Sequence, residues 1–92
     1  MINGNVNEFV DALYYGTENV FVFRRYKFMI QGWWKNDKYT LYMQLWEPPV
    51  EGHDWEYTAP TPAECVDKFL HASLFDGKTF WEAEQEMEWV DD

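Results

Sequence analysis

The residue types that most often bind metal ions in proteins are scarce in this sequence. There is one cysteine, Cys65, and there are two histidines, His53 and His71; with Asp54 and Asp76 they make up the candidate ligands. A metal site needs three or four ligands at a workable spacing, and no pair of these residues shows a spacing that recurs in known sites. We therefore predict that the protein holds no metal ion.

Carboxylate catalysis would need two acidic side chains that converge in one pocket. Near the C-terminus, Glu82, Glu84, Glu86 and Glu88 occupy alternate positions, and on a helix this spacing spreads them around its sides. A glycine-rich phosphate loop, a GxSxG motif and a dinucleotide fingerprint do not occur in the sequence. Cys65 falls on the apolar side of a predicted helix, where we expect a small buried side chain and not a nucleophile. The sequence therefore predicts neither an enzyme nor a cofactor-binding protein.

Nucleic-acid binding is a third kind of chemistry, and the stretch RRYKFMIQGWW at residues 24–34 raises it. Arg24, Arg25 and Lys27 could contact phosphates, and Trp33 could stack on a base. Such binding needs a basic stripe with aromatics between the charges, whereas the next two lysines lie roughly 20 Å away along an extended strand. We interpret the basic cluster as the polar turn of a hairpin.

The chain is strongly acidic, and its charge is unevenly distributed. It has 7 basic and 17 acidic residues, which give a net charge of −10. Residues 1–46 carry five basic and four acidic side chains, whereas residues 47–92 carry two and thirteen. Phosphate backbones and membrane surfaces repel such a chain, and basic proteins attract it. We therefore expect a protein partner with a basic surface, and no nucleic-acid or membrane partner.

The length and composition predict a single domain that spans residues 1–92. Hydrophobic residues make up 47% of the chain, which contains 6 Trp, 6 Tyr and 7 Phe. A domain of this size buries only about 65% of its unfolded surface. Some of these aromatic side chains must therefore line a groove, an interface or another surface.

The sequence gives no sign of export or of membrane insertion. Met1–Asn5 has neither the basic nor the apolar region of a signal peptide. The longest apolar runs are far shorter than the roughly 20 residues that a membrane-spanning helix needs. Because Cys65 is the only cysteine, no internal disulfide can form. These features predict a cytoplasmic protein.

Apolar periodicity predicts one helix followed by three strands in the first half of the chain. Val6, Phe9, Val10 and Leu13 recur at helical spacing, and Gly16 ends the helix. The strands are expected at about residues 19–24, 28–34 and 39–46, where β-branched and aromatic residues are frequent.

The second and third strands form a hairpin whose register follows from its turn. If Lys35 pairs with Lys38 across an Asn-Asp turn, apolar residues of the two strands face one another. One face of the sheet then carries Phe28, Ile30, Gly32, Trp34, Tyr39, Leu41, Met43 and Leu45. The other face carries Met29, Gln31, Trp33, Thr40, Tyr42, Gln44 and Trp46.

The first hairpin has two alternative registers, because its turn contains no Gly, Asn or Asp. A loop of even length places Phe21 and Phe23 on the core face. A loop of three residues places Val20 and Val22 there instead.

The second half of the chain predicts an irregular connection and two helices. Residues 47–60 contain three prolines, and Trp55–Tyr57 is an option for a fourth, short edge strand. Capping boxes at Thr61 and Thr79 begin helices; the first ends before Asp76 and the second continues through Val90. The fold class is therefore α+β, in the order α-β-β-β-α-α: a three-stranded antiparallel sheet with the helices packed on one face.

The predicted last helix offers a first candidate interaction surface. At 100° per residue Trp81, Gln85 and Trp89 form one stripe, and the acids beside it include Glu84 and Glu88. Trp is a common interface anchor, and the acids of residues 82–92 would suit a basic partner. The alternatives are packing of the stripe against residues 47–60 and a solvated acidic helix end. This surface underlies our first hypothesis, a small acidic protein-interaction module with an inhibitory, immunity-like or regulatory role.

The sheet face opposite the helices is a second candidate surface. It presents Trp33, Tyr42 and Trp46, with the basic cluster at one end. Its mixture of aromatic and amide side chains is typical of an interface. The alternatives are that residues 47–60 fold over it or that it forms a twofold homodimer. A second hypothesis is that it binds single-stranded nucleic acid or a small aromatic ligand, with Arg24, Arg25 and Lys27 as the charged contacts.

The segment TPAECVDKFLHASLFDGKTFWEAEQEMEW, which follows the QGWW hairpin, resembles a segment of small bacterial proteins of unknown function. In those proteins a capped helix precedes a D-G-K-[TS] turn and an acidic last helix. The resemblance covers roughly residues 28–90, and its motifs are mostly helix caps and core positions. It implies an architecture and no activity, cofactor or site.

Overall fold

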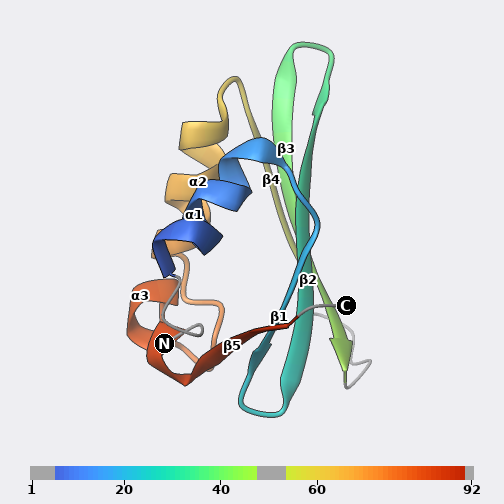
Figure 1. Cartoon of the computed structure of the whole chain (residues 1–92). Helices are drawn as coiled ribbons and strands as arrows, with labels where there is room; N and C mark the ends of the chain where they lie inside the picture. Colours follow the sequence, from blue (N-terminus) through green and yellow to red (C-terminus); the bar gives the residue numbers. More distant parts are fainter. Residues whose placement is uncertain (1–5, 48–53, 91–92) are drawn as a thin grey trace.

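The computed structural model of this chain describes residues 6–47 and 54–90. Its elements are α1 (Val6–Tyr15), β1 (Asn19–Phe23), β2 (Tyr26–Lys35), β3 (Lys38–Glu47), β4 (Trp55–Ala59), α2 (Pro62–His71), α3 (Phe80–Ala83), the 3-10 turn η2 (Glu84–Glu86) and β5 (Met87–Val90). Figure 1 shows the helices on one side of a single sheet, as the sequence predicts. Within the described ranges, no helix has the length and apolar character needed to cross a bilayer.

The sheet has five antiparallel strands in the order β4-β3-β2-β1-β5. The α+β class is therefore confirmed, but the prediction of three strands with an optional fourth is too low. The optional edge strand is present and extends over Trp55–Ala59. Residues 48–53 of the predicted connection lie outside the described residues. The fifth strand lies where the sequence predicts a helix.

The predicted last helix is wrong beyond its first turn. Thr79 forms the expected capping box with Glu82, but α3 ends at Ala83, and Met87–Val90 pairs as β5 with the otherwise exposed edge of β1. A continuous helix would have placed like charges four residues apart, which is unfavourable. On the strand, Glu88 no longer lies one helical turn from Glu84, and the segment gains the backbone hydrogen bonds of a fifth strand.

The helix predicted from Thr61 also ends earlier than expected. Thr61 caps this helix, because its Oγ1 accepts from the Glu64 amide at 3.4 Å, but the Glu64 carboxylate accepts from the Thr61 hydroxyl and not from its amide, and α2 ends at His71. Phe75 and Lys78 then form an antiparallel bridge around a tight turn. This turn places Phe75 in the core.

The register of the β2–β3 hairpin is confirmed. Lys35 pairs with Lys38 and Trp34 with Tyr39. In the Asn-Asp turn between them, Asn36 has φ 53° and Asp37 has φ 63°. Positive φ at both central residues is the pattern of a type I′ turn, which matches the twist of the flanking strands.

The first hairpin adopts the even-length alternative. Phe23 pairs with Tyr26, so that Arg24 and Arg25 form a two-residue loop. Phe21 and Phe23 consequently lie on the core face and are fully buried. Arg24 has φ 56°, a left-handed conformation that costs a non-glycine residue roughly 1–2 kcal/mol.

The core is largely aromatic and lies between the sheet and the helices. The Phe9 ring of α1 lies 5.4 Å from Phe21, 5.7 Å from Phe80 and 5.4 Å from Trp89. Among the largest fully buried side chains are Tyr39, Phe9, Phe21, Phe23, Phe69, Phe75 and Phe80. Most of the phenylalanines are thus used to hold the helices on the sheet.

A close approach of two backbones fixes the end of α1 on β2. Gly16, with φ 74°, ends the helix, and its carbonyl accepts from the Gly32 amide at 3.3 Å. The Tyr39 ring lies over Gly32, and its hydroxyl donates to the Leu13 carbonyl at 2.8 Å. A side chain at Gly32 would overlap the Tyr39 ring, since a Cβ there would lie 2.1 Å from the Tyr39 hydroxyl oxygen.

Candidate functional site

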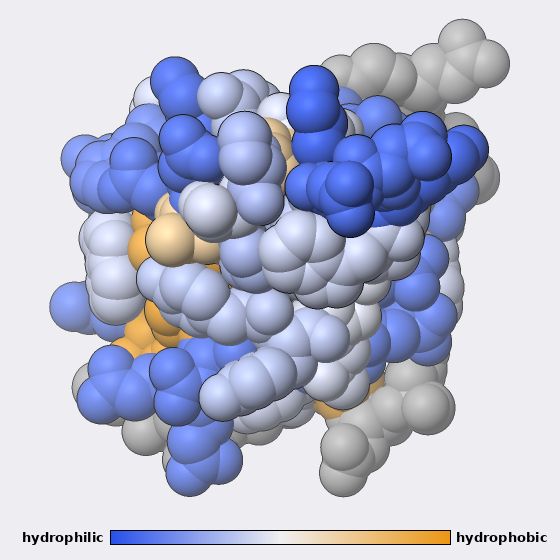
Figure 2. Space-filling view, turned by 90° about the horizontal axis from the view of Figure 1, so that it is seen from above, coloured by the Kyte–Doolittle hydropathy of each residue, from blue (hydrophilic) through white to orange (hydrophobic). Residues whose placement is uncertain are grey.

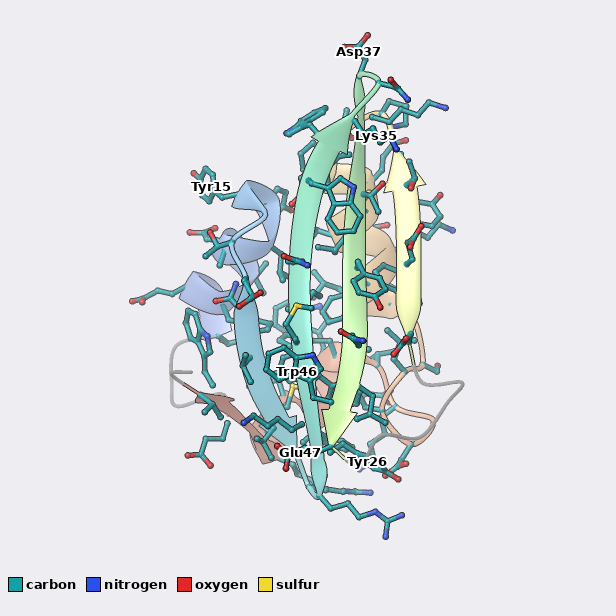
Figure 3. The ribbon with its side chains drawn as sticks, turned by 90° about the vertical axis from the view of Figure 1, so that its right-hand side faces the viewer. Tyr15, Tyr26, Lys35, Asp37, Trp46 and Glu47 are labelled. Carbon is teal, nitrogen blue, oxygen red and sulfur yellow. The ribbon has the colours of Figure 1, made fainter. Side chains whose placement is uncertain are left out.

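The side of the sheet that faces away from the helices is covered by no helix of the described residues (Figure 3). Side chains alternate between the two faces of a strand, so the observed registers define which residues lie there. We call this surface the outer face. Its middle consists of Met29, Gln31, Trp33, Thr40, Tyr42, Gln44 and Trp46, the set predicted from the hairpin register. Val20, Val22, Thr58 and Val90 extend it onto the neighbouring strands.

Three aromatic side chains form the most prominent part of the outer face. Trp33 is 39% exposed, and its ring lies 6.1 Å from the ring of Tyr42. Trp46 is the extra residue of a β-bulge, where Lys27 pairs with Glu47 in a shifted register. Its indole lies across the strands (Figure 3), and its Nε1–H donates to Gln44 Oε1 at 3.2 Å. The aromatic groups are therefore held against the sheet.

The polar groups near these aromatics are hydrogen-bonded to one another. The hydroxyls of Thr40 and Thr58 lie 2.7 Å apart, and the Tyr42 hydroxyl donates to Asp54 Oδ2 at 3.5 Å. Burial is the main cause that raises the pKa of Tyr42, and the nearby Asp54 and Glu56 carboxylates raise it further. The phenol therefore stays protonated at neutral pH and remains a donor.

Charged side chains lie only around the margin of the outer face, as far as the described residues show. Lys35 and Lys38 stand at the β2–β3 turn, and Lys27 lies 3.7 Å from Glu47 near the opposite end. The remaining acids of this face are Asp54 and Glu56 beside β4 and Glu88 on β5. With Asp37 of the β2–β3 turn, the face and its margin have three lysines and five carboxylates, whereas the other described residues have four basic and nine acidic side chains. Figure 2 shows the β2–β3 turn end as mainly hydrophilic.

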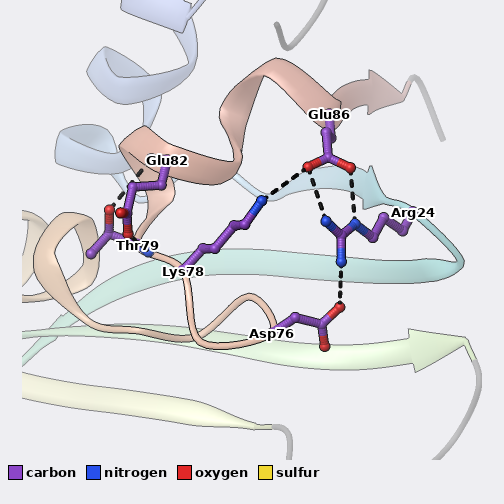
Figure 4. A network of polar contacts seen from close by, with 6 residues as sticks. All are labelled: Arg24, Asp76, Lys78, Thr79, Glu82 and Glu86. Carbon is purple, nitrogen blue, oxygen red and sulfur yellow. Dashed lines mark hydrogen bonds and ion pairs between the residues drawn. The ribbon is translucent and has the colours of Figure 1, made fainter.

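The basic cluster lies at one end of the sheet, where Arg24 is paired with two acids (Figure 4). Arg24 forms two bonds with Glu86, Nε to Oε1 at 2.9 Å and Nη2 to Oε2 at 3.1 Å. Its Nη1 donates to Asp76 at 3.1 Å, and Lys78 lies 3.5 Å from Glu86. The guanidinium of Arg25 lies over the Tyr26 ring. The interpretation of this cluster as a hairpin turn agrees with these contacts.

A shallow groove of about 370 Å³ lies beside this turn. It is lined by Arg24, Arg25, Tyr26 and Asp76. Because Arg24 is already paired with two carboxylates, the groove offers little net positive charge to an anion.

The Arg24–Glu86 pair predicts a specific pH dependence. The hydrogen bond from Arg24 is the largest cause that lowers the pKa of Glu86 below its ordinary value of 4.5. A lowered folded-state pKa means that the contribution to stability is present above pH 4.5 and is lost as the pH falls. We expect urea midpoints to fall less between neutral and acidic pH in Glu86→Gln than in the parent protein.

Both partners of this pair are 42% exposed, so the difference should be modest and should shrink in high salt. Glu88→Gln, on the neighbouring strand, provides the matched control. Equal pH slopes for the parent protein and Glu86→Gln at low salt would contradict the ion pair.

The first candidate surface does not form a single stripe. Trp89 points into the core and lies 5.4 Å from the Phe9 ring, whereas Trp81 is 47% exposed on α3. Gln85 and Glu88 are exposed, but on η2 and β5 they no longer share a helix face. Glu84 is half-buried, and among the described residues its Oε2 is a buried atom without a hydrogen-bond partner. The helix predicted to carry this stripe is therefore wrong. Contact of these residues with a partner stays a prediction. Asp91 and Asp92 lie outside the described residues.

The candidate metal ligands do not come together. Within residues 6–47 and 54–90 there is no group of three His, Cys, Asp or Glu side chains that could hold a metal ion. His71 Nδ1 lies 3.3 Å from Asp67 on the exposed side of α2. Cys65 is buried on the other side of this helix. His53 lies outside the described residues.

The buried thiol of Cys65 is expected to be unreactive in the folded protein. Burial is the main cause that raises its pKa, and Sγ donates to the Tyr39 carbonyl at 3.2 Å. We expect an aromatic disulfide reagent to modify it at least about 1,000-fold more slowly than in the urea-unfolded chain, because reaction requires opening of the core. Rapid modification of the folded protein would show that Cys65 is accessible.

Sequence reasoning did not identify the acids that pair with the aromatic and basic candidates. Asp76 and Glu86 are 52 and 62 residues from Arg24 in the chain. Asp54 accepts from the Leu45 amide at 3.1 Å as well as from Tyr42. No local pattern in the sequence signals such pairs.

Comparisons of the chain with known proteins find no protein-family model, no curated protein and no solved structure that matches it. The resemblance of residues 28–90 to small bacterial proteins therefore stays a prediction.

Proposed function

We propose that this protein is a small acidic protein-interaction module that binds another protein chain through the outer face. The observation that carries the proposal is the layout of that face. Its middle is uncharged and contains Trp33, Tyr42 and Trp46, while the lysines and carboxylates lie at its margin. An aromatic centre with a polar rim is the usual anatomy of a specific protein interface.

The properties of the three aromatic residues support this proposal. Trp33 is exposed near the turn end of its strand pair, and Tyr42 retains a protonated hydroxyl close to it. Trp and Tyr supply large contact areas at little entropic cost, and both are enriched among the residues that dominate binding energies. An inhibitory, immunity-like or regulatory protein would use such a face to occupy a surface of its target.

The alternative, binding of single-stranded nucleic acid or a small aromatic ligand, finds less support. Arg24 is paired with Asp76 and Glu86, and Lys27 with Glu47, so two of the three cations proposed for phosphate contacts are already paired with acids. We expect no quenching of tryptophan fluorescence by a single-stranded oligonucleotide at low salt. Quenching that weakens steeply with added salt would favour this alternative instead.

Site-specific photo-crosslinking in the native cells tests the proposed function directly. A photoreactive amino acid replaces Gln31 or Gln44 in the middle of the outer face, and Asp67, exposed on α2, serves as the matched control position. We expect cross-linked protein adducts from the two outer-face positions and few from the control. Adducts that are absent, or equally frequent at Asp67, would overturn the assignment of this face.

A further inference from the structure

We infer that the chain bound by the outer face is a second copy of this protein, packed sheet against sheet with the strands of the two copies crossed. The inference rests on the proposed function, because it names the partner of the same surface. Three properties of the outer face carry it: its charge, its symmetry and its size.

The first property is the near-neutral charge of the outer face. With Asp37 of the β2–β3 turn it has three lysines and five carboxylates, while the other described residues include nine acidic and four basic side chains. Contact between two copies through any acidic surface would bring like charges together. The outer face is the part of the described structure where two such acidic molecules could meet with the smallest penalty.

The second property is the distribution of the charges around the margin. Lys35 and Lys38 lie at the β2–β3 turn, and Asp54 and Glu56 lie beside the β4 edge. If two copies met with their strands aligned, a twofold axis would bring either the lysine turns or the β4 edges of the two copies together. If the strands cross at nearly 90°, the axis places the lysine turn of each copy over the acidic β4 edge of the other. Crossed packing is one of the two common arrangements of stacked sheets.

The third property is the area of the face. Two strands of about 33 Å and three of about 16 Å, spaced about 4.8 Å apart, give roughly 550 Å² of sheet before side chains roughen it. Stable interfaces bury about 600–1,000 Å² on each partner. The flat area lies just below this range, so the outer face suits a weak dimer, for which we expect a dissociation constant of roughly micromolar magnitude.

The experiment is light scattering or sedimentation of the purified full chain across a dilution series. We expect a monomer–dimer equilibrium in the parent protein, weakened at least about 30-fold in Trp33→Ala because an interface anchor is lost. Trp81→Ala, which removes an exposed tryptophan outside this face, is the matched control and should dimerise normally. Circular dichroism establishes that each variant is folded.

Charge variants test the crossed arrangement. The double variant Lys35→Glu/Lys38→Glu should weaken the dimer, because it places acids against the acidic β4 edge of the other copy. Adding Glu56→Lys should restore most of the affinity, because a positive charge on that edge then faces the new glutamates. Higher salt should tighten the dimer, since it screens the repulsion between two molecules of net charge −10. Binding of a basic partner would instead weaken with salt.

The outcomes separate this inference from the proposed function. A parent protein that stays monomeric, or a dimer that Trp33→Ala leaves unchanged, would overturn the inference of a second copy. If photo-crosslinks from Gln31 then identify a different protein, the proposed function stands with that protein as the partner. If those crosslinks are also absent, both proposals fail.

Discussion

Replacing Gly32 by alanine is expected to destabilise the protein by about 3 kcal/mol or more, because it overpacks a rigid part of the core. A Cβ at this position would lie 2.1 Å from the hydroxyl oxygen of Tyr39 and 2.5 Å from its Cζ. The ring cannot move aside easily, since it is 1% exposed and its hydroxyl donates to the Leu13 carbonyl. The melting temperature should fall by roughly 15 °C or more in a domain of this size.

Gly77→Ala is the matched control for this prediction. Gly77, unlike Gly32, has a positive φ of 82°, and no atom lies within 4 Å of the position that its Cβ would occupy. Its replacement should therefore cost only about 1–2 kcal/mol, the strain of a left-handed backbone. If the two variants were equally mild, the Tyr39 ring would not lie over Gly32.

A double-mutant cycle isolates the contact. In a Tyr39→Leu background the ring is absent, so the additional cost of Gly32→Ala should fall well below its cost in the parent protein. An unchanged cost would place the clash elsewhere, for example with the backbone at Gly16, which lies against Gly32.

The two strands that contain these residues were predictable because their local and tertiary preferences agree. Alternation along β2 and β3 and the Asn-Asp turn both specify the pairing of Lys35 with Lys38. The outer face, with Trp33 and Tyr42, follows from that register. The role of Gly32 was not predictable, because it depends on how closely α1 approaches the sheet.

The C-terminal segment was not predictable, because its local signals and its tertiary surroundings disagree. The capping box at Thr79 and the acidic run after it favour a helix, and the first turn forms as expected. After Glu86 the alternation of Met87 and Trp89 on the core side, opposite the unpaired edge of β1, favours a strand. Pairing with a strand more than sixty residues earlier in the chain is not visible in a local pattern.

The same disagreement explains why the first candidate surface was misjudged. Helical periodicity places Trp81 and Trp89 on one stripe, whereas strand pairing sends Trp89 into the core and leaves Trp81 at the surface. The pairing of Arg24 with Glu86 escaped prediction for a similar reason, since it forms only once η2 is brought beside the first hairpin.

Replacing Trp89 by alanine is expected to destabilise the protein by roughly 2–4 kcal/mol, because it removes a large side chain from the edge of the core. Its ring packs edge-on against Phe9, which also contacts Phe21 and Phe80. Chemical unfolding of the purified variant measures the loss. Trp81→Ala, by contrast, should change the stability by no more than about 0.5–1 kcal/mol, since 47% of its surface is exposed.

The comparison of these two variants decides between the strand and the helix at the C-terminus. If residues 87–90 formed a helix, Trp81 and Trp89 would occupy equivalent positions on an exposed stripe, and the two substitutions would have similar, small effects. A large loss for Trp89→Ala alone places this residue under α1 and assigns it to the core. Trp81 on α3, and not Trp89, would then be available to a partner on the helix side of the molecule.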